Sequence, residues 1–374
     1  MVKIKIGDVC EILNGYAFKS DKYVDDGIRI IRIANVQKGK IEDNVPAFYP
    51  IHSEGIDKYM LEEGDLLMSL TGNVGRVAVL EKEFLPAALN QRVACLRLKN
   101  KKISKGFLFH VLNSDFFEQQ CIQNSKGVAQ KNMSTEWLKE FEIPLYSIEE
   151  QTKITEILDK IRNIIAKRND EFEKLDDLIK ARFVEMFGDV GTGKYNYETC
   201  KLGEVTSIGS SHRVFTSEFV EKGIPFYRGT EIAELASGNK PVDPYYISEE
   251  HYQRLVSDNT RPQVGDLLMP SICNKGQVWM VDTEEPFYYK DGRVLCISPD
   301  RTVFNSKFLQ YFMREKTMVE YPKMGSGSTF AEFKIFLLKD MDVLVPPKEL
   351  QNQFADFVNL VNKSKLYITY KNST

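Results

Sequence analysis

Two short polar segments of the chain carry side chains that could bind phosphates or the edges of nucleic-acid bases. Each segment follows a copy of the sequence GDLLM, and the two copies begin at Gly64 and Gly265. The segments read SLTGNVGR from Ser69 and SICNKGQ from Ser271. Hydroxyl, amide and cationic groups on a turn can hydrogen-bond phosphate oxygens and base edges, but any solvated turn uses the same groups. The candidate residues here are Thr71, Asn73, Arg76, Ser271, Asn274, Lys275 and Gln277.

Two glycine-bearing segments could supply further contacts of the same kind. One runs from Ser125 to Asn132, and the other reads GSGSTF from Gly325. Lysine, amide and hydroxyl groups suit a nucleic-acid backbone, although a solvated loop would also contain them. A pair of arginines occupies matching positions in the segments QRVACLRL and GRVLCISP. These segments add Lys126, Gln130, Lys131, Asn132, Ser326, Ser328, Arg92 and Arg293 to the candidates.

The sequence gives no pattern from which a catalytic or metal site can be nominated. The run GDVGTGK from Gly188 has the glycines and the lysine of a phosphate-binding loop. However, Tyr195 stands where such a loop needs a Ser or Thr for magnesium, and a helical pattern precedes the run instead of a strand. The six cysteines form no CxxC pair. We therefore expect reduced thiols and a cytoplasmic location.

Composition excludes some classes of protein and leaves others open. The formal net charge of −3 argues against a polybasic chain that coats nucleic acid, although a local basic face stays possible. No apolar run approaches the roughly 18–20 residues that span a bilayer, so no membrane contact is expected. The start MVKIKIGDVCEIL lacks the pattern of a signal peptide.

The similarity between the two halves extends well beyond GDLLM. The stretch GIRIIRIANV from Gly27 matches GIPFYRGTEI from Gly223, and the segment from Leu138 matches the segment from Leu338. Two copies are too few for a solenoid, so the chain is predicted to contain a tandemly duplicated α+β domain, at residues 1–147 and 200–346. Strands are predicted at 28–36, 65–70, 76–80 and 92–98. One helix per domain is predicted, at 107–123 and 308–321.

A long helical segment is predicted after the first domain. From 148 to 187, apolar residues alternate at spacings of three and four, with an interruption at Arg168. A shorter stripe follows the second domain, at 347–374, and includes Phe354, Val358 and Val361. Two such stripes can bury each other as an antiparallel coiled coil, although the first could instead pack on its own domain. Residues 188–199 are predicted to be a linker.

This arrangement of parts resembles the specificity (S) subunits of type I restriction-modification systems. The resemblance rests on the GDLLM segment, the glycine-bearing loop and the LKEFEIPLYSIEEQTKI segment before a long helix, all of which occur twice. It implies two target recognition domains that each read half of a bipartite, asymmetric DNA sequence, and long helices that form a central coiled coil. The second helical region looks shorter than is usual in that family.

The resemblance also implies partners and assigns the chemistry to them. Two methyltransferase (M) subunits would use S-adenosylmethionine, and restriction/translocase (R) subunits would use ATP and Mg. The chain itself would bind double-stranded DNA, hold no cofactor and be non-catalytic. Two other hypotheses remain at this point: a two-module scaffold that binds protein or carbohydrate, and an enzyme that acts through carboxylates.

Overall fold

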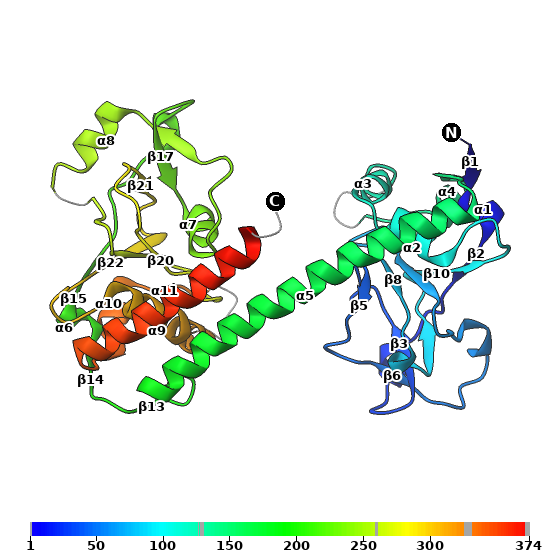
Figure 1. Ribbon diagram of the computed structural model, residues 1–374, viewed down its shortest axis with the longest axis horizontal. Coiled ribbons are helices and arrows are strands. Elements are labelled where there is room, and N and C mark those ends of the chain that lie inside the picture. Colours follow the sequence, from blue (N-terminus) through cyan, green and yellow to red (C-terminus); the bar gives the residue numbers. More distant parts are fainter. Residues whose placement is uncertain (1, 126, 128–130, 259–260, 325–330, 371–374) are drawn as a thin grey trace. The chain divides into compact units, whose positions relative to one another are not determined.

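The structure, a computed structural model, describes residues 2–125, 127, 131–258, 261–324 and 331–370, with side chains up to residue 365. The chain divides into two compact units, Met1–Arg168 (unit 1) and Asn169–Thr374 (unit 2). The division falls inside the long helix α5 (Ile148–Phe187), at the arginine that interrupts its apolar stripe. Each unit combines small sheets with helices, which confirms the predicted α+β class (Figure 1).

Unit 1 contains two small sheets and two strand pairs. One sheet has the order β2-β10-β7-β8 and is antiparallel, and the other has the order β6-β3-β9, in which β3 and β9 are parallel. β1 pairs with β11, and β4 pairs with β5. The strands are β1 (Lys3–Lys5), β2 (Cys10–Asn14), β3 (Ile28–Ile31), β4 (Val36–Gln37), β5 (Lys40–Ile41), β6 (Phe48–Tyr49), β7 (Leu66–Ser69), β8 (Val77–Val79), β9 (Ala87–Leu89), β10 (Val93–Leu98) and β11 (Glu142–Pro144).

Unit 2 repeats this topology. Its antiparallel sheet has the order β15-β22-β19-β20, and its second sheet has the order β16-β18-β17-β21, in which β17 and β21 are parallel. β14 pairs with β23 as β1 pairs with β11. The strands are β12 (Gly188–Asp189), β13 (Lys194–Tyr195), β14 (Thr199–Lys201), β15 (Thr206–Gly209), β16 (Phe219–Val220), β17 (Ile224–Tyr227), β18 (Tyr245–Ile247), β19 (Leu267–Pro270), β20 (Trp279–Met280), β21 (Tyr288–Tyr289), β22 (Val294–Pro299) and β23 (Asp342–Leu344).

Helices occur between the strands and after them in both units. Short 3₁₀ turns lie between strands at Ser20–Lys22, Asp57–Tyr59, Lys82–Phe84 and Thr216–Glu218, and another follows α9 at Tyr321–Met324. The α-helices are α1 (Ile6–Val9), α2 (Lys105–Leu112), α3 (Asp115–Gln123), α4 (Thr135–Glu140), α5, α6 (Leu202–Val205), α7 (Gly229–Ala236), α8 (Glu249–Leu255), α9 (Ser306–Glu320), α10 (Ile335–Lys339) and α11 (Lys348–Tyr370).

Two predictions of secondary structure were wrong in detail. The single helix predicted at 107–123 is two helices, α2 and α3, because the Ser114 hydroxyl caps a new helix by accepting the Phe117 N–H at 3.2 Å. The strand predicted at 28–36 ends at Ile31. There the Asn35 side chain accepts the Arg32 N–H at 2.9 Å and bends the chain into a turn.

The predicted antiparallel helix pair is present in unit 2. The C-terminal part of α5 and α11 run in opposite directions, since Phe354 packs on Phe187 while Lys365, further along α11, binds Asp176, further back on α5 (Figure 1). Phe183 lies between them, with 1% of its surface exposed. At the start of α5, Ile154 also packs partly against the core of unit 1. In unit 1 the side chains of Ile157, Ile161, Ile164 and Ile165 on α5 are exposed.

Residues 188–199, predicted to be a linker, form part of the folded unit 2. β12 and β13 make an antiparallel hairpin, and Val190 at its turn is buried in the core that also contains Phe187. The Asp189 side chain accepts the Gly191 N–H at 2.8 Å. The GDVGTGK run is therefore a hairpin turn, and no helix follows it directly as in a phosphate-binding loop.

Candidate functional site

The aspartate of each GDLLM copy is a structural residue. Asp65 accepts the Glu62 N–H at 2.8 Å and two hydrogen bonds from the Arg97 guanidinium, at 2.7 and 2.8 Å. In unit 2, Asp266 accepts the Gln263 N–H at 2.8 Å and one hydrogen bond from the Arg301 guanidinium at 3.0 Å. Both aspartates are buried, and a buried carboxylate is tolerated when donors and a cation surround it. The pair fixes the start of the strand that leads into each candidate turn.

The candidate turn of unit 1 connects β7 and β8. Ser69 is buried, and its hydroxyl donates to the Asn73 carbonyl at 2.5 Å and accepts the Arg76 N–H at 3.1 Å. Gly75 has a φ of +81°, and a Cβ at this position would lie 2.8 Å from the Cys121 side chain. The turn therefore has one defined shape, and this shape requires glycine.

The glycine-bearing segment of unit 1 lies directly beside this turn. The Gly72 N–H donates to the Lys131 carbonyl at 3.0 Å, and the Met133 N–H donates to the Leu70 carbonyl at 2.8 Å. On the other side, the Leu70 N–H donates to the Arg92 carbonyl at 2.9 Å. The structure thus brings together six predicted residues, which we call the unit 1 turn surface: Thr71, Asn73, Arg76, Arg92, Lys131 and Asn132.

The side chains of this surface differ in their partners. Arg76 donates to the side chain of Gln37 on β4. The backbone of Thr71 forms a bridge with Asn132, but its buried hydroxyl has no hydrogen-bond partner among the described residues. Arg92 is exposed, and no ion pair involves it among the residues that the structure describes. Lys126 and Gln130 lie outside the described residues.

The corresponding region of unit 2 contains a cavity of about 390 Å³ whose cations come from the ends of strands. Arg228 directly follows β17 and Lys290 directly follows β21. Because β17 and β21 are parallel neighbours, both residues emerge at the same edge of the sheet. Arg293 precedes β22 and accepts the Ser271 N–H through its carbonyl, at 2.8 Å. We call this cavity the basic cavity; it is lined by Arg228, Gly229, Thr230, Ala233, Pro270, Ser271, Ile272, Gln277, Lys290 and Arg293.

The three cations of the basic cavity differ in their partners. Arg228 donates hydrogen bonds from its Nε and its backbone N–H to the buried Glu231. This carboxylate raises the pKa of the Arg228 guanidinium. The guanidinium carbon lies 4.5 Å from the centre of the Tyr245 ring. Arg293 pairs with Glu332. No ion pair involves Lys290 within the described part of the chain. An anionic group would therefore meet one uncompensated charge and two shared ones.

The remaining predicted residues of unit 2 have different roles. Gln277 shapes the turn, since its side chain accepts the Lys275 N–H at 2.9 Å and donates to Asn274 at 3.3 Å. Lys275 is exposed at the tip of that turn. Ser326 and Ser328 lie outside the described residues.

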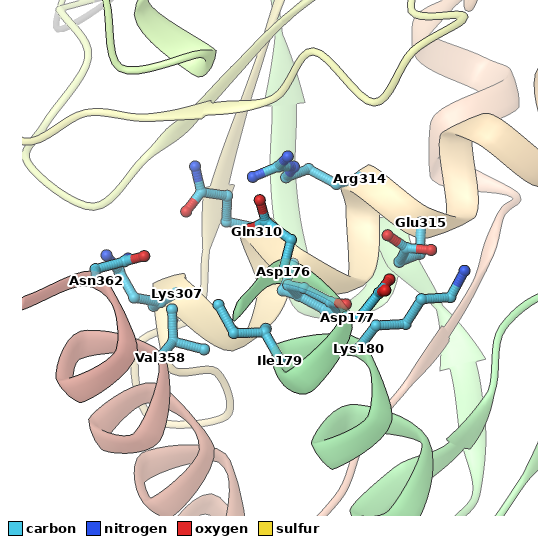
Figure 2. A pocket seen from close by; sticks show the side chains of 11 residues that line it. Asp176, Asp177, Ile179, Lys180, Lys307, Gln310, Arg314, Glu315, Val358 and Asn362 are labelled. Atoms are coloured by element: carbon cyan, nitrogen blue, oxygen red, sulfur yellow. The ribbon is translucent and has the colours of Figure 1, made fainter. Parts of the chain in front are cut away.

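Another cavity of unit 2 is unsuited to a polyanion. It has a volume of about 220 Å³ and lies between α5, α9 and α11 (Figure 2). Three carboxylates and three cations line it, so the charges balance. They are Asp176, Asp177, Glu315, Lys180, Lys307 and Arg314.

Residues 1–174 match the family model of the type I restriction modification DNA specificity domain. This part of the chain is therefore similar to the DNA specificity domain of type I restriction-modification systems. The MjaVIII specificity subunit of Methanocaldococcus jannaschii is 31% identical over 180 residues, which are 46% of this chain and 42% of that relative. The EcoBI specificity subunit of Escherichia coli is 27% identical over 199 residues, which are 53% of this chain and 40% of that relative. The matches thus span less than half of either relative's length.

A solved structure is similar to this chain in fold. The crystal structure of the type I restriction-modification system S subunit from M. genitalium has a TM-score of 0.55 to this chain. The two chains are 14% identical, and the match covers 100% of this chain and 92% of that chain. At this identity the likeness concerns the fold alone. It agrees with the repeated sheet order of units 1 and 2.

Sequence reasoning missed three cations of this chain: Arg32, Arg228 and Lys290. A signal for two of them was present, because Arg32 and Arg228 are the shared arginine of the aligned stretches GIRIIRIANV and GIPFYRGTEI. Each follows a strand that has a parallel neighbour, β3 or β17. Lys290 gave no such signal, since Asn90 occupies the equivalent position after β9 in unit 1.

Within the described ranges, no group of three or more His, Cys, Asp and Glu side chains is placed to hold a metal ion. None of the helices described is both long and apolar enough to cross a membrane.

Proposed function

We propose that the chain is the sequence-specific DNA-recognition subunit of a type I restriction-modification complex. Unit 1 reads one half of a bipartite target through the turn surface, and unit 2 reads the other half through the turn that follows its own GDLLM copy. One observation carries the proposal: in both units a fixed turn after GDLLM lies beside an arginine that ends or begins a strand. Cations and amides in that arrangement suit phosphates and base edges.

The target is asymmetric because the two units present different side chains at equivalent positions. Arg76 in unit 1 corresponds to Gln277 in unit 2, and Asn90 corresponds to Lys290. Arginine typically binds guanine, whereas glutamine typically binds adenine, so these substitutions change what a surface can read. Two different surfaces imply two different half-sites.

We further propose that the chain is non-catalytic and works with partners in the cytoplasm. Two methyltransferase subunits would bring S-adenosylmethionine, and restriction/translocase subunits would bring ATP and Mg, as the family resemblance implies. The term "specificity subunit" in the names of the relatives supports this division of labour. The six cysteines are unpaired thiols, as expected in a reducing compartment.

Methylome sequencing tests the proposal directly. The chain is co-expressed with the methyltransferase encoded beside it, and genomic DNA is sequenced for modified bases. The expected result is methylation at one gapped, asymmetric sequence, which disappears when the methyltransferase is expressed alone. Methylation that is independent of this chain would contradict the proposal. Methylation or cleavage of DNA by the purified chain alone would contradict its non-catalytic role.

A further inference from the structure

The basic cavity contains a hydroxyl group, on the buried residue Ser271, that has no hydrogen-bond partner among the described residues. Ser271 has 2% of its surface exposed and lines the cavity. Its backbone is engaged, with the N–H donated to the Arg293 carbonyl and the carbonyl accepting the Phe333 N–H, both at 2.8 Å. Its hydroxyl has no hydrogen-bond partner among the residues that the structure describes. Buried polar groups are normally paired, so this hydroxyl is available to a ligand in the cavity.

The start of α7 faces the same cavity. Gly229 and Thr230 are the first residues of this helix and line the cavity. No carbonyl within the helix can accept the N–H groups of its first turn, and these groups carry partial positive charge. The Glu231 carboxylate accepts the Arg228 N–H at 2.7 Å, the Arg228 guanidinium and its own backbone N–H, but within the described residues it accepts neither the Gly229 nor the Thr230 N–H.

The groups that face the cavity therefore favour an acceptor with negative charge. The Lys290 ammonium, the Ser271 hydroxyl and the two helix N–H groups can all donate hydrogen bonds. A base edge offers donors as well as acceptors, whereas a phosphate offers acceptor oxygens alone. Unit 1 has no equivalent, because the β4–β5 hairpin follows Arg32 where α7 follows Arg228, and Asn90 replaces Lys290.

We propose that the basic cavity holds a backbone phosphate of the DNA duplex bound by unit 2. Lys290, the Ser271 hydroxyl and the N–H groups of Gly229 and Thr230 bind that phosphate. The contact anchors unit 2 on the duplex independently of sequence, while its turn reads the bases. This inference rests on the proposed function and adds to it an anchor that unit 1 lacks.

The salt dependence of duplex binding tests the inference. The full-length chain is titrated with a fluorescent duplex of random sequence at several NaCl concentrations. Each phosphate contact made by a cation contributes about 0.9 to the slope of log affinity against log salt. We expect Lys290→Ala to reduce the slope by about 0.9 and Lys290→Arg to keep it. Lys307→Ala, which removes a lysine from the charge-balanced cavity, is the matched control and should keep the wild-type slope (Figure 2).

A neutral variant separates the hydroxyl from the charge. Ser271→Ala should weaken duplex binding about tenfold, which is typical of a lost hydrogen bond to a charged group, and should leave the slope unchanged. Thermal unfolding of each variant, followed by the fluorescence of Trp279, checks that unit 2 is folded.

Each contrary outcome is distinguishable. A folded Lys290→Ala variant with the wild-type slope overturns the cavity inference, and so does weakened binding that is confined to some sequences, since it would indicate base reading. If ATP or inorganic phosphate stabilises the wild type but not Lys290→Ala while duplex binding is equal, the cavity takes a free phosphate and the inference fails. A wild-type chain that binds no duplex at all rejects the proposed function itself.

Discussion

Gln151 of α5 in unit 1 and Gln351 of α11 in unit 2 each make three hydrogen bonds in the same pattern. The Gln151 side chain accepts the Ser104 N–H at 2.8 Å and donates to two backbone carbonyls, at 2.8 and 2.9 Å. Gln351 accepts the Asn305 N–H at 2.9 Å and donates to two carbonyls, at 3.0 and 2.8 Å. Both residues are fully buried. Each fixes the start of a long helix onto the body of its unit.

Removing either glutamine should destabilise its own unit. Gln351→Ala leaves a buried N–H and two carbonyls without partners, and each such group costs about 1–3 kcal/mol. We expect a loss of about 2–4 kcal/mol in the free energy of unfolding of unit 2.

Tryptophan fluorescence during urea unfolding can measure this loss, because each unit contains one of the two tryptophans, Trp137 and Trp279. Trp137→Phe leaves only the signal of unit 2. The exposed Gln253→Ala is the control and should change stability by less than about 0.5 kcal/mol. An equally small effect of Gln351→Ala would show that the helix is not held by this residue.

The α5–α11 pair should depend on one aromatic side chain. Phe183 contacts the rings of Phe187, Phe308 and Phe354. Phe183→Ala should lower the stability of unit 2 by about 3–5 kcal/mol, the usual cost of removing a buried phenyl ring. Leu178 lies on the same helix but is about half exposed, so Leu178→Ala should cost no more than about 0.5 kcal/mol. Similar losses for the two variants would mean that the helices do not bury this face.

The two turns should act on different half-sites. On the proposed function, Arg76→Ala should relax specificity at one position of one half, because a lost base contact costs about 1–3 kcal/mol, and Lys275→Ala should affect the other half. Methylome sequencing of cells that carry each variant with the methyltransferase measures both effects. Changes by both variants within the same half would be inconsistent with one unit per half-site.

The Glu231 carboxylate should make the stability of unit 2 depend on pH. Burial alone would raise its pKa, but hydrogen bonds from the side chain and the N–H of Arg228 outweigh burial and hold the pKa below its usual 4.5. A carboxylate with a lowered pKa stabilises the folded state above its unfolded pKa, and this stability is lost as pH falls through the folded value. Wild type should therefore exceed Glu231→Gln in stability at neutral pH, and the difference should shrink below pH 4.5. A difference that is constant with pH in urea unfolding would exclude an ionised Glu231.

The sequence alone predicted the duplicated α+β organisation and the helix pair, since both depend on patterns that are read locally. The repeated GDLLM strands and the spacing of Ile179 and Phe183 show which faces are apolar, without showing which segments pack against those faces. It also located the turn at Thr71–Arg76, because glycines and polar residues between two apolar runs predict a turn with little dependence on the rest of the chain.

Only the tertiary structure decided which residues share a site. Arg228 and Lys290 are far apart in the sequence and become neighbours because β17 and β21 pair in parallel. It also decided where the helical stripe is covered: Phe183 is buried by α11, whereas Ile161, which continues the same pattern in unit 1, is exposed. Sequence periodicity shows that a helix face is apolar, but it does not show which segment packs against that face. The packing partner is a segment distant in the sequence, and the two make contact only when the chain folds.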